Sequence, residues 1–219
     1  MTSTNSPPDD PVPGPTTITG VVLCGGQGSR LGGIDKGLIM YRERTLVCHA
    51  LAALSCVAAT RLINANRNLE AYTRLGFPVI TDPTQDYPGP LAGILAAFNY
   101  ATTPFVLTLP CDMPLMDGDA LNRLISAWNP GSSEIVTVSD GIRLHPVVAL
   151  LDTRLKVSLE EYLANNQRKV ETWFHNHYLT LADFSDRPDV LANLNTKEDW
   201  QQLGQFAPHS SSMSYRGHA

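Results

Sequence analysis

The sequence predicts an α/β fold in which helices cover both faces of a mostly parallel sheet, giving three layers. Segments with the length and β-branched content of strands alternate along the chain with segments whose apolar residues recur at helical spacing. One strand, residues 105–109, is an almost continuous apolar run, which is typical of the buried middle of a parallel sheet. Right-handed crossovers between parallel strands place the intervening helices on the two faces.

The chain has 219 residues, a length that suits one domain with a substantial core. We assign that domain to residues 18–205. Residues 1–17 contain five prolines and neither lysine nor arginine, so we expect a disordered lead-in rather than an export signal. Residues 206–219 are rich in serine and also contain histidine, and we expect a disordered tail there.

Composition narrows the class of protein. Hydrophobic residues make up 43% of the chain and charged residues 17%, which is ordinary for a soluble globular enzyme. The net charge of −5 argues against a nucleic-acid polymer as partner. No apolar run approaches the ~20 residues of a membrane span. A small anionic ligand remains possible as partner, because one locally basic loop is enough to bind it.

The four cysteines indicate a reducing cytoplasm, because they form no C-x-x-C pair, metal-ligand spacing or disulfide framework. Cys24 and Cys111 stand beside the most distinctive motifs. Each suits a position that requires a small buried residue, and a nucleophilic thiol is the alternative.

The first predicted strand, Ile18–Leu23, leads into a glycine-rich loop. Residues 25–37 contain six glycines together with Arg30 and Lys36. Glycines let backbone N–H groups approach an anion closely, and the two cations add fixed positive charge. Open α/β sheets bind ligands beyond the carboxyl ends of their strands. The loop therefore predicts a phosphate site, and a glycine-rich turn that serves only chain geometry is the alternative.

The spacing of the loop excludes two common nucleotide motifs. A dinucleotide fingerprint requires G-x-G-x-x-G, but Leu31 occupies the last glycine position. A P-loop requires Gly-Lys-Ser/Thr after four residues, but Ile34 follows Gly33. The pattern present is L-x-G-G-x-x-x-R-L-G-G-x-D-K, which resembles the signature loop of sugar-nucleotide and cofactor nucleotidyltransferases.

The next elements continue the alternation. Residues 45–54 place their apolar side chains on one helical stripe. Residues 61–65 and 77–80 are short apolar runs that predict strands, and each is followed by polar residues. Alanine content and spacing predict a helix over 89–100, and the apolar strand 105–109 follows it.

The second half of the chain contains the remaining elements. Asp117 is expected to cap a helix that ends at Trp128. Residues 134–138 and 146–151 are predicted strands, separated by a turn at Asp140-Gly141. The last predicted elements are two helices, a strand and a closing helix capped by its first residue: 155–163, 170–175, 178–182 and 196–203.

Distinctive polar residues follow three of these strands. Asn64 and Asp82 come at the ends of two of them, where either could close a turn or contact a ligand. Asp112 follows the apolar strand and lies between two prolines. A hard divalent cation bound to phosphates is a natural partner for such a carboxylate. Parallel strands bring these residues to one edge of the sheet, beside the glycine-rich loop.

In its sequence motifs the chain resembles the molybdenum cofactor guanylyltransferases, which attach GMP to molybdopterin. The match runs from Ile18 to about Gln202. The glycine-rich loop is common to many nucleotidyltransferases, whereas two further segments are more specific. These are Asn64-Ala65-Asn66-Arg67 and Asp86-Tyr87-Pro88-Gly89-Pro90-Leu91-Ala92-Gly93. The resemblance also includes Pro110-Cys111-Asp112-Met113-Pro114, His145-Pro146 and Asn193-Leu194-Asn195-Thr196.

The resemblance implies a Rossmann-like fold of the nucleotide-diphospho-sugar transferase type and a set of ligand-binding residues. Cys24 departs from the family, which usually has alanine at this position, but cysteine and alanine are both small residues. Asn64 and Asp82 are expected on the base and ribose side. The positions that match GTP-binding residues are Leu23, Cys24, Gly25, Lys36, Asn64, Asp82 and Asp112.

The resemblance also implies the reaction, in which the terminal phosphate of molybdenum-molybdopterin attacks the α-phosphorus of GTP and releases pyrophosphate. Mg²⁺ is the expected cofactor, with Asp112 as its ligand. Arg30 and Lys36 are expected to hold the triphosphate, so that Arg30, Lys36 and Asp112 form the catalytic group. Transient docking to proteins that deliver molybdopterin or accept the cofactor is expected, without a nucleic-acid polymer or a membrane.

Three further residues are candidates for the pterin side of the site: His145, Asn193 and Asn195. For His145, a histidine satisfied by the backbone is the alternative. Two other functions also stay open. One is cytidylyl transfer or transfer to a sugar phosphate by the same loop, and the other is a non-enzymatic nucleotide-binding or partner-binding module.

Overall fold

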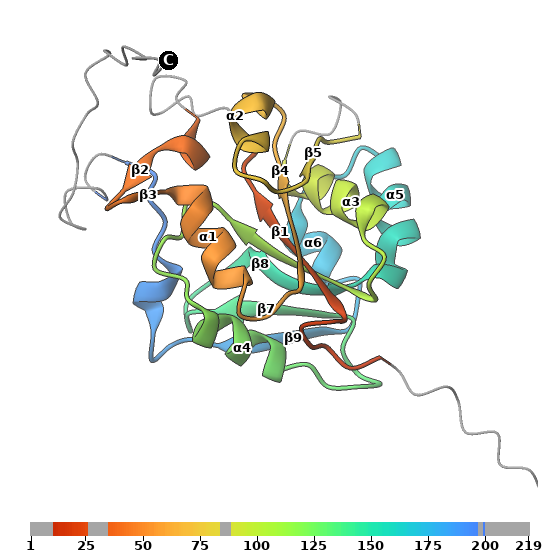
Figure 1. Cartoon of the computed structure of the whole chain (residues 1–219). Helices are drawn as coiled ribbons and strands as arrows, with labels where there is room; N and C mark the ends of the chain where they lie inside the picture. The colour runs from red at the N-terminus through yellow and green to blue at the C-terminus, as the bar shows by residue number, and fades with distance from the viewer. Residues whose placement is uncertain (1–10, 26–34, 84–88, 197–198, 200–219) are drawn as a thin grey trace, which may run out of the picture.

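A computed structural model gives the structure of the protein and describes residues 11–25, 35–83, 89–196 and 199. Within these residues, seven strands form one sheet in the order β5-β4-β1-β6-β8-β7-β9 (Figure 1). The bounds of these strands are β1 Ile18–Leu23, β4 Thr60–Asn64, β5 Val79–Ile80, β6 Phe105–Pro110, β7 Ile135–Ser139, β8 Leu144–Asp152 and β9 Leu179–Asp183.

The direction of the strands determines which residues meet. β1 pairs in parallel with β4 and β6, and β4–β5 and β7–β9 are also parallel pairs. β8 runs antiparallel to both of its neighbours, β6 and β7. The carboxyl ends of the other strands therefore meet at one edge, together with the beginning of β8. We call this edge the carboxyl edge.

Helices pack on both faces of the sheet (Figure 1). On one face, side chains from α1 (Leu46–Leu54) and α4 (Gly118–Ser126) share a buried cluster with Ile18 and Val22 of β1. On the other face, Val21 and Leu23 of the same strand pack in a cluster with α3 (Pro90–Tyr100), α5 (Lys156–Ala164) and α6 (Val170–Phe174). Successive side chains of a strand point to opposite faces, so one apolar strand contributes to both clusters.

Smaller elements follow the carboxyl ends of β1 and β4. After β1 and the glycine-rich loop, the chain forms a 3-10 turn, η2 (Lys36–Leu38), and a hairpin of β2 (Met40–Tyr41) and β3 (Arg44–Thr45). A short helix, α2 (Leu69–Thr73), connects β4 to β5. Two further 3-10 turns lie later in the chain, η3 (Thr153–Leu155) and η4 (Pro188–Leu191).

The predicted α/β fold with a mostly parallel sheet and helices on both faces is confirmed. The alternation of strands and helices in the sequence does not predict the reversed direction of β8. A parallel connection needs a crossover, whereas β7 and β8 are joined by a turn in which Asp140 Oδ1 accepts hydrogen bonds from Ile142 N and Arg143 N, both at 2.9 Å. Such a short connection permits only an antiparallel pair.

The structure describes part of the predicted lead-in. Residues 11–17 run along the end of the sheet, where Ala59 N donates to Pro15 O at 2.9 Å and Phe105 N donates to Thr17 O at 3.1 Å. Residues 1–10 and the predicted tail, 206–219, lie outside the described residues. Among the helices that are described, none has the length and apolar character to cross a membrane.

Candidate active site

The carboxyl edge gathers the ends of β1, β4 and β6. Leu23 at the end of β1 pairs with Asn64 on one side and with Pro110 on the other. Beyond the strands, Cys24 N donates to Asn64 O at 2.9 Å and Cys111 N donates to Leu23 O at 3.2 Å. The predicted nucleotide-binding residues of β1 and β4 are thus adjacent to the segment that carries Asp112.

The glycine-rich loop is described at its two ends. Gly25 is exposed, and among the described residues a Cβ at this position would meet no heavy atom within 4 Å, so this part of the structure leaves the backbone open to a ligand. Residues 26–34, which include the predicted catalytic Arg30, lie outside the described residues. The described chain resumes at Asp35, immediately before Lys36.

Lys36, Asp112 and Asn195 come from distant parts of the chain and meet at the carboxyl edge. Lys36 Nζ lies 3.4 Å from Asp112 Oδ2, and it also donates to Asn195 Oδ1. The Lys36 and Asp112 side chains are 24% and 18% exposed, so the pair is half-buried but remains open to solvent. The structure therefore brings together one residue predicted for the triphosphate, one for the metal and one for the pterin side.

The segment that carries Asn195 is fixed to this cluster by backbone contacts. Leu194 N donates to Asp112 O at 2.9 Å. Asp199 Oδ2 accepts hydrogen bonds from Thr196 N at 2.7 Å and from Asn195 N at 2.8 Å. These two bonds, the one from Thr196 first, hold the pKa of Asp199 below its ordinary value. Asp199 N in turn donates to Thr196 Oγ1 at 3.2 Å, so the predicted cap at Thr196 is present. Residues 197–198 and 200–203 of the predicted helix lie outside the described residues.

Asn64 and Asp82 also meet, as the sequence analysis predicts for neighbouring strand ends. Asn64 Nδ2 donates to Asp82 Oδ1 at 2.9 Å. Asn66 holds Asp82 from a second direction, because its Nδ2 donates to Asp82 Oδ2 at 2.7 Å and its Oδ1 accepts from Asp82 N at 2.8 Å. A Cβ at Gly93 of α3 would lie 2.5 Å from Asn64 Oδ1, so the helix packs directly against the Asn64 amide.

A second acidic group, Asp35, lies beside Lys36 and was not among the predicted site residues. Its carboxylate is buried and accepts a hydrogen bond from Tyr72 Oη at 2.6 Å and one from Asn68 Nδ2 at 3.0 Å. Burial, reinforced by the nearby Cys24 and by Asp35, raises the pKa of the Tyr72 hydroxyl well above its ordinary value. Tyr72 therefore stays protonated and acts as the donor.

Cys24 and Cys111 lie at facing positions beyond β1 and β6, and both are buried. Burial first, and then the neighbouring Cys111, raises the pKa of the Cys24 thiol well above its ordinary value. Only the thiolate is a strong nucleophile. The environment of Cys24 therefore favours its interpretation as a small buried residue over the nucleophilic alternative.

His145 begins its strand at the carboxyl edge, since it is the second residue of β8. Its Nε2 lies 2.9 Å from Asp140 Oδ2, in the turn before the strand. The ring is thus paired with a carboxylate, not with the backbone as the alternative for this residue proposed. Within the described residues, its ring hydrogen bond goes to Asp140 and not to the cluster of Lys36, Asp112 and Asn195.

Oxygen donors near Lys36 fit a hard divalent cation. Within the described residues, no three His, Cys, Asp or Glu side chains gather as a metal site. Mg²⁺ commonly uses only one or two protein carboxylates, together with substrate phosphates and water. Asp112 supplies a carboxylate, and Asn195 supplies an amide oxygen beside it. Asn193 Oδ1 is buried without a hydrogen-bond partner among the described residues, which makes it a further oxygen donor close in sequence to Asn195.

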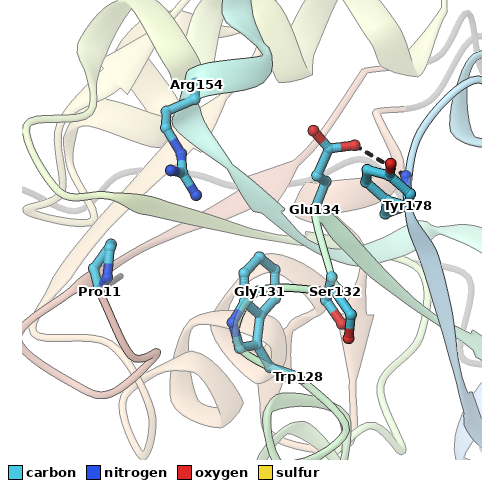
Figure 2. Close-up of a pocket in the computed structure, with 8 residues that line it drawn as sticks. Pro11, Trp128, Gly131, Ser132, Glu134, Arg154 and Tyr178 are labelled. Atoms are coloured by element: carbon cyan, nitrogen blue, oxygen red, sulfur yellow. Dashed lines mark hydrogen bonds between the residues drawn. The ribbon is translucent and has the colours of Figure 1, made fainter. Parts of the chain in front are cut away.

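A pocket lies at the opposite end of the sheet, where β7 and β9 begin (Figure 2). It has a volume of about 320 Å³, and its lining includes Pro11, Trp128, Glu134, Arg154 and Tyr178. Glu134 Oε2 accepts a hydrogen bond from Tyr178 N at 2.9 Å, which is drawn as the dashed line in Figure 2. No predicted site residue lines this pocket, so the candidate active site is the open carboxyl edge.

Comparison with known proteins identifies the family. The model of the MobA-like NTP transferase domain matches residues 20–180. The chain is 38% identical over 189 residues to a molybdenum cofactor guanylyltransferase of Shewanella piezotolerans, covering 86% of this chain and 93% of that one. It is 37% identical over 192 residues to the enzyme of the same name from Shewanella loihica, covering 88% and 98% of the two chains.

Solved structures share the fold. Molybdopterin-guanine dinucleotide biosynthesis protein A from Archaeoglobus fulgidus superposes with a TM-score of 0.71 at 20% identity, covering 84% of this chain and 96% of that one. A 2-C-methyl-D-erythritol 4-phosphate cytidylyltransferase from Thermus thermophilus superposes with a TM-score of 0.63 at 15% identity, covering 84% and 95%. At these identities the likeness is one of fold, shared by nucleotidyltransferases with different substrates.

Proposed function

This chain belongs to the MobA-like NTP transferase family, and from that membership we propose that it is a molybdenum cofactor guanylyltransferase. It transfers GMP from GTP to the terminal phosphate of molybdenum-molybdopterin, forming the guanine dinucleotide cofactor and pyrophosphate. The observation that carries this function is the 38% identity to an enzyme of that name over 86% of the chain. The meeting of Lys36, Asp112 and Asn195 at the carboxyl edge supports the carboxyl edge as the proposed location of that reaction.

We propose that the nucleotide lies across the ends of β1 and β4. Open backbone at Gly25 and the ammonium group of Lys36 suit the triphosphate, and Arg30 of the same loop would add a second cation. Asn64 and Asp82, fixed to each other at 2.9 Å, suit the base and ribose. A carboxylate held by two amides presents its remaining lone pairs in a fixed direction, which favours a nucleobase that donates hydrogen bonds.

The reaction needs positioning and charge stabilisation more than proton transfer. A phosphate monoester, with its second pKa near ~6, is largely ionised at neutral pH and is already a nucleophile. Two anions must meet, and negative charge develops on the departing pyrophosphate. Lys36 is the described cation best placed to offset this charge, because its Nζ lies among acceptors at the carboxyl edge.

We propose Mg²⁺ as the cofactor, held by Asp112 with Asn195 and Asn193 as neighbouring oxygen donors. When bound, such an ion polarises phosphate oxygens and neutralises charge on the triphosphate. The Leu194 N–H donates to Asp112 O at 2.9 Å, and this bond holds the backbone from which the Asp112 carboxylate extends. The substrates are thus a nucleotide and molybdopterin, and Asn193, Asn195 and His145 are our candidates for the pterin side.

Cellular context follows from the same proposal. The four cysteines are free thiols, which supports the expected reducing cytoplasm. Transient docking to proteins that deliver molybdopterin or receive the finished cofactor remains part of the proposal. The alternative of cytidylyl or sugar-phosphate transfer has weaker support, because the cytidylyltransferase likeness is at 15% identity and is one of fold.

Calorimetric titration of the purified chain with GTP, CTP, ATP and UTP, each with and without Mg²⁺, tests the proposal. We expect selective, Mg²⁺-assisted binding of GTP, followed by pyrophosphate release when molybdopterin is added. Preference for CTP would retain the fold but change the function to cytidylyl transfer. If none of the four nucleotides binds, the proposed enzymatic function is contradicted and a partner-binding module is favoured.

A further inference from the structure

We propose that the buried carboxylate of Asp35 is a positioning group for Lys36, and that Tyr72 and Asn68 hold it in place. The inference rests on the proposed function, in which Lys36 contacts the triphosphate, and it adds residues to which no role is assigned above. Asp35 is 6% exposed and Tyr72 is fully buried. Surface polar groups are solvated by water, but these two side chains are buried. We therefore look for a role of their hydrogen bond in the site.

Both oxygens of the Asp35 carboxylate are engaged. Tyr72 Oη donates to Oδ1 at 2.6 Å, and Asn68 Nδ2 donates to Oδ2 at 3.0 Å. Arg67 Nε lies 3.7 Å from Oδ2 and adds a positive charge. A buried carboxylate without partners is costly, so these three groups fix where the Asp35 backbone lies relative to the segment that ends in α2.

Because Asp35 and Lys36 are consecutive residues, fixing the Asp35 backbone also fixes the backbone of Lys36. Asp35 is the residue that precedes η2, and Lys36 is the first residue of that turn. Leu38 N donates to Asp35 O at 3.1 Å, and Ile39 N donates to Lys36 O at 3.0 Å, which closes the turn. Lys36 Nζ is directed to Asp112 and Asn195, so Asp35 anchors the base of the lysine while its tip reaches the site.

Gly37 gives independent support for the contact between η2 and α2. A Cβ at this position would overlap the Tyr72 hydroxyl oxygen and would lie 3.2 Å from Cys24 Sγ. The glycine is not in a left-handed conformation, so close packing is what requires it here. The turn that carries Lys36 therefore lies directly against the Tyr72 side chain.

Residues 64–72 therefore hold side chains in two parts of the proposed site, the nucleoside side and the phosphate side. Asn64 and Asn66, at the end of β4, hold Asp82 on the proposed nucleoside side. A few residues later, Asn68 and Tyr72 hold Asp35 on the proposed phosphate side. Residues 64–72 thereby align the lysine with the bound nucleotide, and catalysis is sensitive to small errors in such alignment.

The test is Tyr72→Phe, which removes one hydroxyl and leaves the ring. Tyr162→Phe is the matched control, because Tyr162 is also buried and donates its hydroxyl to Lys169 O at 2.9 Å, on the other face of the sheet. We expect kcat for guanylyl transfer to fall about tenfold in Tyr72→Phe, the loss typical of a hydrogen bond to a charged group, while KM for GTP changes little. The control should keep the parental kcat. Circular dichroism and thermal melting of both variants verify the fold.

A double-mutant cycle shows whether Tyr72 acts through Lys36. Tyr72→Phe is combined with Lys36→Ala and assayed in single turnover. If Tyr72 positions the lysine, its substitution loses most of its effect in the Lys36→Ala background. An equal loss of kcat in both backgrounds would overturn the proposal, and so would an unchanged kcat in Tyr72→Phe. Asp35→Asn, which retains the volume of the side chain, should reproduce the Tyr72→Phe result.

Acetylation of lysines by acetic anhydride separates this inference from the proposed function. The rate at Lys36 relative to the exposed Lys156, measured by mass spectrometry, should rise in Tyr72→Phe and not in Tyr162→Phe. This readout needs no molybdopterin. A parental enzyme without guanylyl transfer would contradict the proposed function alone, whereas an unchanged Lys36 acetylation rate would contradict the positioning of Lys36.

Discussion

Lys36 and Asp112 form an ion pair, and Lys36 also donates a hydrogen bond to Asn195. Their side chains are 24% and 18% exposed and 3.4 Å apart, so each retains access to water and to a ligand. Ion pairs that retain contact with solvent are screened by it and contribute little to folding. The value of this pair therefore lies in what it binds, and its loss should be visible in turnover rather than in stability.

We predict that Lys36→Ala and Asp112→Ala each reduce guanylyl transfer by about a hundredfold or more, as loss of a preorganised electrostatic contact does. The kcat of the purified variants is measured alongside their melting temperatures. Lys156→Ala is the matched control, because Lys156 pairs with Glu160 at 4.0 Å on the exposed surface of α5. Near-normal turnover by either site variant would remove the role assigned to that residue.

Asp82 offers a second test at the residue scale. Asp82→Asn keeps the shape of the side chain but gives it an amide, which places a donor opposite one of the Asn64 and Asn66 amides. We predict that the Kd for Mg²⁺·GTP rises roughly tenfold, the effect of one lost or opposed hydrogen bond. Calorimetric titration measures it, with exposed Asp189→Asn as control. An unchanged Kd would show that Asp82 lies away from the nucleotide.

The sequence predicted which polar residues meet when each directly follows a strand. Asn64, Asp82 and Asp112 lie at the ends of parallel strands, so topology alone brings them to one edge. Asp35 and Tyr72 could not be paired in this way. Their contact depends on how a 3-10 turn and a five-residue helix pack together, and neither element has enough periodicity to be recognised in the sequence.

At the scale of elements, the contact of η2 with α2 leaves no room for an added methyl group. We predict that Gly37→Ala lowers the free energy of unfolding by about 1–3 kcal/mol, because a Cβ would overlap the Tyr72 hydroxyl oxygen. Urea denaturation monitored by circular dichroism measures the change. Gly25→Ala is the control for stability, since a Cβ there meets no heavy atom of the described residues within 4 Å. Equal stability of the two variants would show that η2 moves freely against α2.

The turn between β7 and β8 should make part of the stability depend on pH. The hydrogen bond with His145, then those from Arg143 N and Ile142 N, hold the pKa of Asp140 well below its ordinary value. A carboxyl whose pKa is lowered by folding stabilises the protein above its unfolded pKa of about 3.9, and this contribution is lost as the pH falls toward the folded pKa.

We therefore predict that Asp140→Asn is less stable than the parent at pH 7, and that the difference shrinks as the pH is lowered below about 4. Urea denaturation at a series of pH values measures it. The exposed Asp189→Asn serves as the control and should give no such trend. A difference between Asp140→Asn and the parent that is constant with pH would exclude the Asp140 carboxylate as its source.

The long elements were predictable because their patterns are strong, and the short ones were not. α1 and α4 repeat apolar residues over more than two turns, and β6 is apolar along almost its whole length. β5 covers Val79–Ile80 only, half of the predicted strand, because its two-residue ladder with β4 ends where the chain leaves the sheet. The reversed direction of β8 depends on the hydrogen bonds of one turn, which alternation of strand and helix does not reveal.

For the molecule as a whole, the sheet places the candidate active site and the pocket at opposite ends of its strands. β1, β4 and β6 lie side by side in the sheet, and their carboxyl ends carry the candidate site. The pocket at the start of β7 and β9 opens on the opposite end. Substitutions among the residues that line this pocket should therefore leave the proposed substrate contacts in place.

The interior position of β1 in the sheet also has a consequence during synthesis. It is the first strand to be made, yet its two neighbours begin at Thr60 and Phe105. At about 5–20 residues per second, the ribosome needs on the order of 2–9 s between completing β4 and completing β6. Throughout that interval the apolar strand that leads to the glycine-rich loop has an open edge, and non-local pairing of this kind is slow and exposed to aggregation. Chaperone dependence of the nascent chain should therefore be greatest before residue 110 has emerged.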